Sequence, residues 1–219
     1  MNIVDTITAI ATASAMLVNV LGFTAVKPHT LAQHEMSLEN RYPEKSVNDV
    51  FKDNILLTIT YMKEKTPNAH TVNWGDVEKP FAYEFTLKPQ ETFAFHDDVL
   101  SDYKGKVTRT TNAHFNAQEG FKTDGYLFGD GVCHLASLFY WTAKDAGLIA
   151  KAPTNHDFHE IPDIPKEYGV AILNVPGQES SNAAQNLYIT NTREKPVVFR
   201  FDYDGKKLKL TASAIENIQ

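Results

Sequence analysis

The strongest constraint on the fold is one amphipathic stretch near the middle of the chain. Its apolar positions recur at helical spacing and form a single face: Val132, Leu135, Ala136, Phe139, Thr142, Ala143 and Ala146. Gly147 follows at the point where a left-handed residue ends a helix. The spacing therefore predicts a helix over residues 132–147 that buries one face against the rest of the domain.

Alternating patterns on both sides of this helix predict the sheet. Residues 81–87 alternate between apolar and polar positions, as in a half-buried strand. Further strands are predicted at 92–95, 170–173, 187–190, 197–203 and 207–210, and Asp204-Gly205 predicts a hairpin between the last two. A second helix is predicted from Ser46 to Met62. The fold class is therefore α+β, a mostly antiparallel sheet packed against the central helix 132–147 and preceded by an N-terminal hydrophobic helix.

The N-terminal hydrophobic helix is predicted from residues 7–26, a stretch of 20 residues without a charged side chain. That length is enough to cross a hydrocarbon core as a helix. We expect residues 1–26 to be a signal-anchor or a cleaved signal peptide, residues 27–45 a polar linker, and residues 46–219 the folded domain. The expected location is the cell membrane, single-pass with the domain outside the cytoplasm, or alternatively secretion.

Composition excludes several classes of function. The protein has 21 Lys and Arg against 27 Asp and Glu, a net charge of −6, so nucleic acid is not an expected partner. A single cysteine, Cys133, cannot form an intramolecular disulfide or a multi-thiolate metal site. The sequence gives no reason to expect a cofactor or a metal.

Cys133 lies at the start of the central helix, directly after Gly129-Asp130-Gly131-Val132. A helix N-terminus favours thiolate over thiol and lowers a cysteine pKa, which is the placement that a nucleophile needs. The glycines would leave room for backbone donors from Gly131 to Cys133 to reach an oxyanion. The base would be His156 or His159, and the residue that orients the imidazole would be Asp157, Asp163 or Asn174.

Two other interpretations of the same residues stay open. Cys133 is equally read as a small buried residue, with Gly129, Asp130, Gly131, His134 and Tyr126 lining a binding site that performs no turnover. Aromatic residues such as Tyr126, Phe128 and Tyr140 could line a groove for sugar rings or peptide. A metal site built from histidines such as His96 and His114 with Asp97 and Asp98 is a weaker alternative, because no pair has a ligand spacing such as HExxH.

The segment Gly129-Asp130-Gly131-Val132-Cys133-His134 resembles the G-G-G-[IV]-C-Q motif of the VanW-like family of bacterial cell-envelope proteins. LKPQETFAFHDDVL resembles that family's strand-turn-strand region, the helix through AKDAGL resembles its central helix, and QNLYITNTREKPVVFRFDYDGKKLKL resembles its closing strands. The similarity covers roughly residues 80–210.

The sequence also departs from the family pattern. Asp130 stands where the motif has its middle glycine, His134 replaces the usual Gln, and an Arg-Asp pair of the family falls on Tyr168-Gly169. The resemblance implies an envelope location, frequent N-terminal membrane attachment and a link to peptidoglycan or the glycopeptide response. It implies no settled activity.

Two functions follow from these observations. The first is a binding or scaffolding module for peptidoglycan or its peptide, attached to the membrane through its N-terminal helix. The second is a cysteine-dependent hydrolase or acyltransferase on cell-wall peptides. Between them, the sequence favours the module slightly, because no residue is evident that would orient the imidazole.

Overall fold

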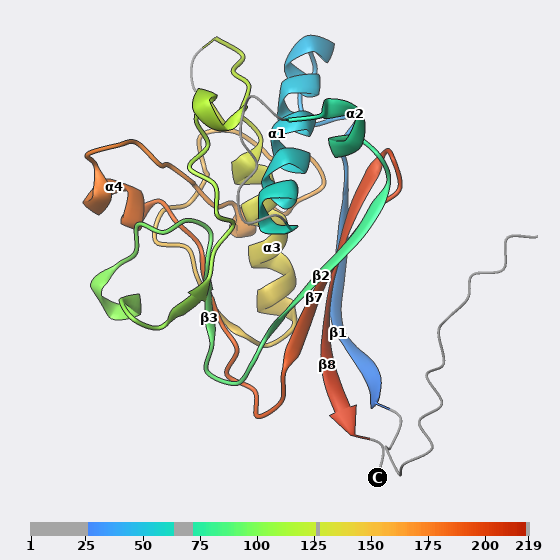
Figure 1. Ribbon diagram of the computed structural model, residues 1–219, viewed down its shortest axis with the longest axis vertical. Coiled ribbons are helices and arrows are strands. Elements are labelled where there is room, and N and C mark those ends of the chain that lie inside the picture. Colours follow the sequence, from blue (N-terminus) through green and yellow to red (C-terminus); the bar gives the residue numbers. More distant parts are fainter. Residues whose placement is uncertain (1–25, 64–71, 126–127, 218–219) are drawn as a thin grey trace, which may run out of the picture.

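Two four-stranded sheets lie on either side of one central helix, α3 (Val132–Asp145), in the computed structural model (Figure 1). The structure describes residues 26–63, 72–125 and 128–217. Helix α3 packs against strands of both sheets and against the first helix. Its apolar face, predicted from the sequence, is buried from Val132 to Ala143.

The first sheet is antiparallel and has the order β1 (Val26–Ser37), β8 (Lys207–Asn217), β7 (Val197–Tyr203) and β2 (Phe81–Leu87). Hairpin β7–β8 turns at Asp204-Gly205, as predicted, and Gly205 has a φ of 104° there. Strand β7 buries every second residue, so the period-2 pattern of the sequence corresponds to one face turned to the core.

The second sheet is built from short strands in the order β4 (Val107–Arg109), β3 (Thr92–Ala94), β6 (Tyr188–Thr190) and β5 (Ile149–Lys151). Strands β3 and β4 are parallel, and the other two pairs are antiparallel. Because β5 directly follows α3, it ties the end of the helix to this sheet.

Three further helices of the described residues lie outside the two sheets, and the first of them packs against α3. They are α1 (Lys45–Lys63), α2 (Trp74–Val77) and α4 (Glu179–Ala184), with short 3₁₀ turns at Ser101–Tyr103, Ala117–Glu119 and Lys166–Tyr168. The prediction of a helix beginning near Ser46 is confirmed by α1.

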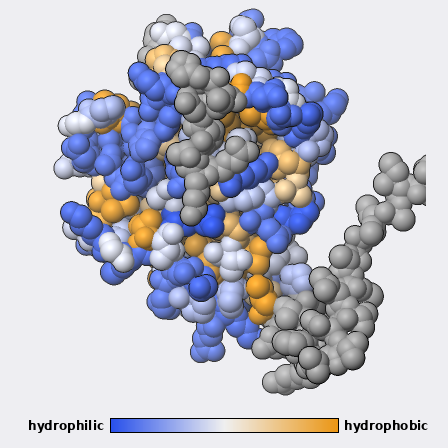
Figure 2. All heavy atoms as spheres, in the orientation of Figure 1, coloured by the Kyte–Doolittle hydropathy of each residue, from blue (hydrophilic) through white to orange (hydrophobic). Residues whose placement is uncertain are grey.

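An aromatic cluster joins α3 to both sheets. The ring of Phe139 on α3 lies 4.8 Å from the ring of Phe93 on β3 and 4.8 Å from that of Phe199 on β7, centroid to centroid. The pair of Phe139 with Phe199 is edge-to-face, an arrangement that adds stability beyond the area it buries. The outer surface is mostly hydrophilic with small apolar patches on the face that Figure 2 shows.

Two predictions about the organisation of the protein were wrong. Much of the predicted linker 27–45 is strand β1, which pairs with β8 along its whole length, and Arg41 beyond it is fully buried. The strand was missed because it lies at the edge of its sheet, where Pro28 and exposed polar residues are tolerated. Residues 170–173 were predicted to be a strand of the sheet, but they belong to neither sheet.

The predicted N-terminal hydrophobic helix lies outside the described residues. Within residues 26–63, 72–125 and 128–217, none of the helices combines the length and the apolar character that a membrane crossing requires.

Candidate functional site

A cavity of about 550 Å³ opens beside the first turn of α3. Its walls come from α1, from the glycine loop before α3 and from residues 171–176. The lining includes seven of the residues that the sequence singled out: Gly129, Asp130, Gly131, Cys133, His134, His156 and Asn174. The structure therefore brings most of the candidate site together in one place.

The two glycines serve packing. A Cβ atom on Gly131 would lie 2.6 Å from the backbone oxygen of Phe51 on α1, and one on Gly129 would lie 2.8 Å from Cβ of Phe115. Both glycines have positive φ angles, 96° and 86°. The sequence suggested that these glycines leave open space next to the sulfur. Instead, the absence of a Cβ atom lets α3 begin directly against the backbone of α1.

Cys133 is held against the backbone of Ile172. Its Sγ accepts a hydrogen bond from the N–H of Ile172 at 3.4 Å and lies 3.8 Å from the carbonyl oxygen of the same residue. Burial, with a smaller contribution from the nearby carboxylate of Asp130, raises the pKa of the Cys133 thiol from 9 to about 11. The predicted lowering of this pKa by the helix N-terminus is therefore wrong, since desolvation outweighs the helix dipole.

Two histidines line the cavity without reaching the sulfur. In the part of the protein that the structure describes, no imidazole nitrogen is hydrogen-bonded to Sγ of Cys133. His156 donates from Nδ1 to the backbone oxygen of His159 at 3.2 Å, which fixes its tautomer. The His134 ring is only 3% exposed and packs edge-on against Phe51, and burial holds its pKa well below the ordinary value. Its Nδ1 is buried without a partner.

Asp130 is the ionisable carboxyl group on the cavity wall. Its Oδ2 accepts a hydrogen bond from the N–H of Asp124 at 3.1 Å, while its backbone oxygen accepts one from Asn54 at 2.9 Å. Burial raises the pKa of Asp130 from 3.8 to about 6. Neither Lys nor Arg is among the described residues that line the cavity, so no cation lowers this pKa from inside it.

The other predicted catalytic residues lie outside this cavity. The Asp163 carboxylate accepts hydrogen bonds from the N–H of Ser37 at 2.9 Å and from the Arg41 guanidinium at 2.6 Å. It therefore ties the loop after β5 to the end of β1, and its predicted role in orienting the imidazole of His156 has no support in the geometry. Burial lowers the pKa of Arg41 to about 10, although Asp163 opposes this shift.

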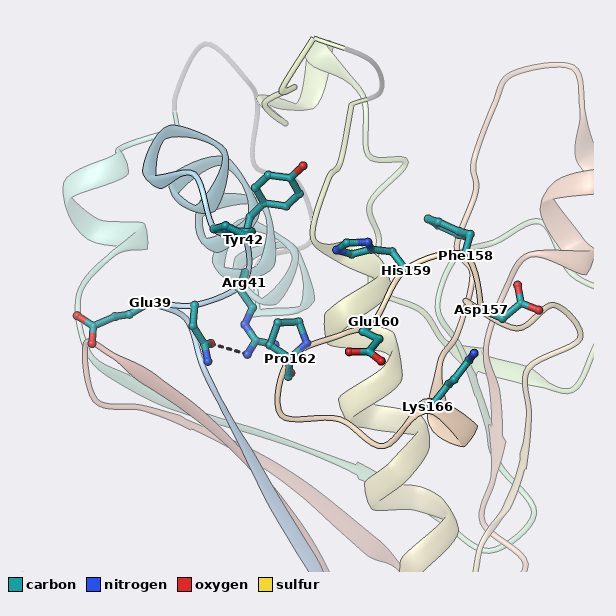
Figure 3. A pocket seen from close by; sticks show the side chains of 11 residues that line it. Glu39, Arg41, Tyr42, Asp157, Phe158, His159, Glu160, Pro162 and Lys166 are labelled. Atoms are coloured by element: carbon teal, nitrogen blue, oxygen red, sulfur yellow. Dashed lines mark hydrogen bonds between the residues drawn. The ribbon is translucent and has the colours of Figure 1, made fainter.

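His159 and Asp157 line a separate hollow of about 800 Å³, together with Arg41 and Tyr42. Figure 3 shows the ring of His159 between Tyr42 and Phe158, and the Tyr42 and His159 ring centroids are 6.3 Å apart. The Arg41 guanidinium points along this wall and donates a hydrogen bond to Asn40 at 2.7 Å (Figure 3). The carbonyl oxygen of His159 accepts a hydrogen bond from His156, which lines the cysteine cavity, and the neighbouring Phe158 lines both cavities.

The remaining candidates are placed as follows. Tyr126 lies outside the described residues. His114 binds Glu119 through Nδ1 at 2.7 Å and Asp97 through Nε2 at 3.3 Å, and it forms ion pairs with both when it is protonated. Across the described residues, no group of three or more His, Cys, Asp or Glu residues could hold a metal ion.

Sequence reasoning missed the aromatic residues that shape the cavity. Phe51 and Phe115 form part of its wall, and Phe158 is 77% exposed at the same cavity. Phe128, which the sequence did suggest for a groove, is 49% exposed there. The signal available for Phe158 was a lone apolar residue inside the polar segment NHDFHE.

Fold and cavity together define an α+β domain in which a Gly-x-Gly-x-Cys turn begins a helix held between two sheets. The family model described as VanW like protein matches residues 82–212, more than half of the sequence. The protein therefore belongs to the VanW-like family, as the sequence motifs predicted. No curated protein and no solved structure matches it.

The close contact at Gly131 predicts a large loss of stability in Gly131→Ala. The added Cβ would clash with the backbone of Phe51, which cannot move aside as the end of a flexible side chain can. The positive φ of residue 131 would also strain an alanine at this position. We expect the free energy of unfolding in urea to fall by more than about 3 kcal/mol. Gly177→Ala is the control, because Gly177 has a φ of 79° but no atom within 4 Å, so only about 1–2 kcal/mol is expected. Equal losses would contradict the packing role.

The raised pKa of Asp130 predicts a pH-dependent effect of Asp130→Asn. The carboxyl group loses its proton near pH 3.8 in the unfolded protein and near pH 6 in the folded one, so wild type loses stability as pH rises across this window. Relative to wild type, the variant should therefore become more stable between pH 4 and 6, as measured by urea unfolding at several pH values. Asp204→Asn should show no such change between pH 4 and 6 and a change of the opposite sign only below about pH 3.8, because backbone N–H groups lower the pKa of Asp204. A flat difference at Asp130 would refute the shift.

Proposed function

We propose that this protein is a non-catalytic recognition module of the bacterial cell envelope that binds peptidoglycan in the cavity beside Cys133. The observation that carries the proposal is a preformed cavity of about 550 Å³ whose thiol has a pKa near 11. Concave sites of about 300–1,000 Å³ with apolar walls and a few convergent polar groups are typical ligand sites. The link to peptidoglycan comes from the family, and so does attachment to the membrane through residues 1–26.

The chemistry of the cavity favours binding over turnover. A cysteine nucleophile needs an appreciable thiolate fraction at neutral pH and an imidazole within reach to accept its proton. Cys133 has a raised pKa, and its sulfur bonds to the backbone of Ile172. Two exposed aromatic residues, Phe128 and Phe158, instead offer apolar contact area to a ligand.

The alternative function, a cysteine hydrolase or acyltransferase, makes an opposite prediction for thiol reactivity. With a pKa near 11 rather than 9, native Cys133 should react with iodoacetamide at pH 7.5 about a hundred times more slowly than an ordinary thiol. Its rate should rise about tenfold per pH unit. Protein unfolded in urea is the control for intrinsic reactivity. Rapid labelling of the folded protein below pH 7 would rule out the module and favour the enzyme.

Binding itself is tested by sedimentation of the protein with purified peptidoglycan sacculi. We expect wild type and Cys133→Ser to bind equally, and Phe128→Ala and Phe158→Ala each to lower the affinity about tenfold. Ile149→Ala is the matched control, because Ile149 is 59% exposed but lines neither the cavity beside Cys133 nor the hollow beside Arg41. Release of soluble peptide or sugar fragments by wild type, and not by Cys133→Ser, would overturn the proposal.

A further inference from the structure

Residues 170–175 use one edge of their backbone as a strand does. The N–H groups of Ala171 and Leu173 donate to the backbone oxygens of Thr154 and Gln185, at 3.1 and 3.0 Å. The N–H of Val175 donates to Oδ1 of Asn182 at 3.0 Å. Alternate residues of an extended segment direct their N–H and C=O groups to the same side. The N–H groups of the odd-numbered edge are therefore all occupied.

The even-numbered edge faces α3 and the cavity. The N–H of Val170 donates to Oγ of Ser137 at 2.9 Å, and the N–H of Ile172 donates to Sγ of Cys133 at 3.4 Å. Cys133 lines the cavity, so this edge continues along the cavity wall. The thiol takes the place that a backbone group of a neighbouring strand would occupy opposite Ile172.

Asn174 is the next residue on that edge, and it has no hydrogen-bond partner among the described residues. Its amide nitrogen, Nδ2, is buried without a partner although the residue lines the cavity. A buried donor without an acceptor costs about 1–3 kcal/mol. A ligand that supplies an acceptor at this position would remove the cost.

We propose that the cavity takes an extended peptide, which adds a short strand to the free backbone edge at Asn174 and offers a carbonyl oxygen to Nδ2. This inference rests on the proposed function and narrows it to the peptide part of peptidoglycan. Strand addition to an unpaired edge obtains affinity from backbone hydrogen bonds and specificity from pockets for alternate residues. Here the apolar contacts come from Phe128 and Phe158.

The charges in the cavity agree with a neutral backbone as the ligand. Neither Lys nor Arg is present among its described lining residues, and the neighbouring carboxyl of Asp130 would repel an anion. The amide groups of a peptide carry no charge and both donate and accept hydrogen bonds. They match a wall that presents backbone N–H and C=O groups together with the amide of Asn174.

Two probes separate the peptide from the sugar. The first is the disaccharide-peptide fragment released from sacculi by a muramidase, and the second is the same disaccharide after an amidase has removed the peptide. With full-length protein, we expect the first probe to bind and to slow hydrogen exchange of the backbone N–H of Asn174 at least tenfold, because the N–H groups of Ile172, Leu173 and Val175 are already hydrogen-bonded. The second probe should produce neither effect.

Variants at Asn174 test the contact itself. Asn174→Asp keeps the shape of the residue but replaces the Nδ2 donor by an oxygen, so it should weaken binding of the disaccharide-peptide at least tenfold. Asn112→Asp is the control, because Asn112 is exposed and lies outside the lining of the cavity. It should bind as wild type does.

The outcomes distinguish the two proposals. Binding of both probes with equal affinity, or binding of the peptide fragment without slower exchange at Asn174, would overturn the strand-addition proposal and leave peptidoglycan recognition intact. Failure of both probes and of sacculi to bind would overturn both proposals.

Discussion

The contact between Gly131 and the backbone of Phe51 fixes the geometry on which the rest of the site depends. At this point the first turn of α3 meets α1 with no Cβ atom between them. Any residue with a Cβ would push the helix start outward, and with it Cys133 and His134. The cavity is consequently a product of helix packing, and the glycine motif that suggests an oxyanion site in the sequence is first of all a packing motif.

Fixing the helix start in this position determines the electrostatics of the sulfur. Cys133 is directed at the backbone of Ile172, and the desolvation that follows outweighs the favourable field of the helix N-terminus. Asp130, which stands where the family motif has a glycine, adds a carboxyl group next to the thiol and raises its pKa further. The same turn that would activate a cysteine in an open, electropositive setting therefore keeps this one protonated.

Periodicity predicted those parts of the fold that bury one regular face. Strands β2 and β7 were found because they alternate between core and solvent, and helix α3 was found because its apolar residues recur at helical spacing. Edge strand β1 has few buried positions, so its sequence looks like a linker. The candidate residues of the cavity could be predicted from their residue types and positions. The burial of the thiol and the pairing of Asp163 with Arg41 could not, because both depend on contacts between distant parts of the sequence that no local pattern encodes.

Residues 170–173 show what an incorrect strand prediction can reveal. Their composition is that of a strand, and their hydrogen bonds alternate as in a strand, yet they belong to neither sheet because their even-numbered edge meets the Ser137 and Cys133 side chains of α3 in place of a strand. An unpaired edge is a hazard for aggregation unless it is covered, and here α3 covers it as far as Ile172, while Asn174 lines the cavity. A strand sequence without a partner strand is therefore the observation from which we propose that the cavity binds a peptide backbone.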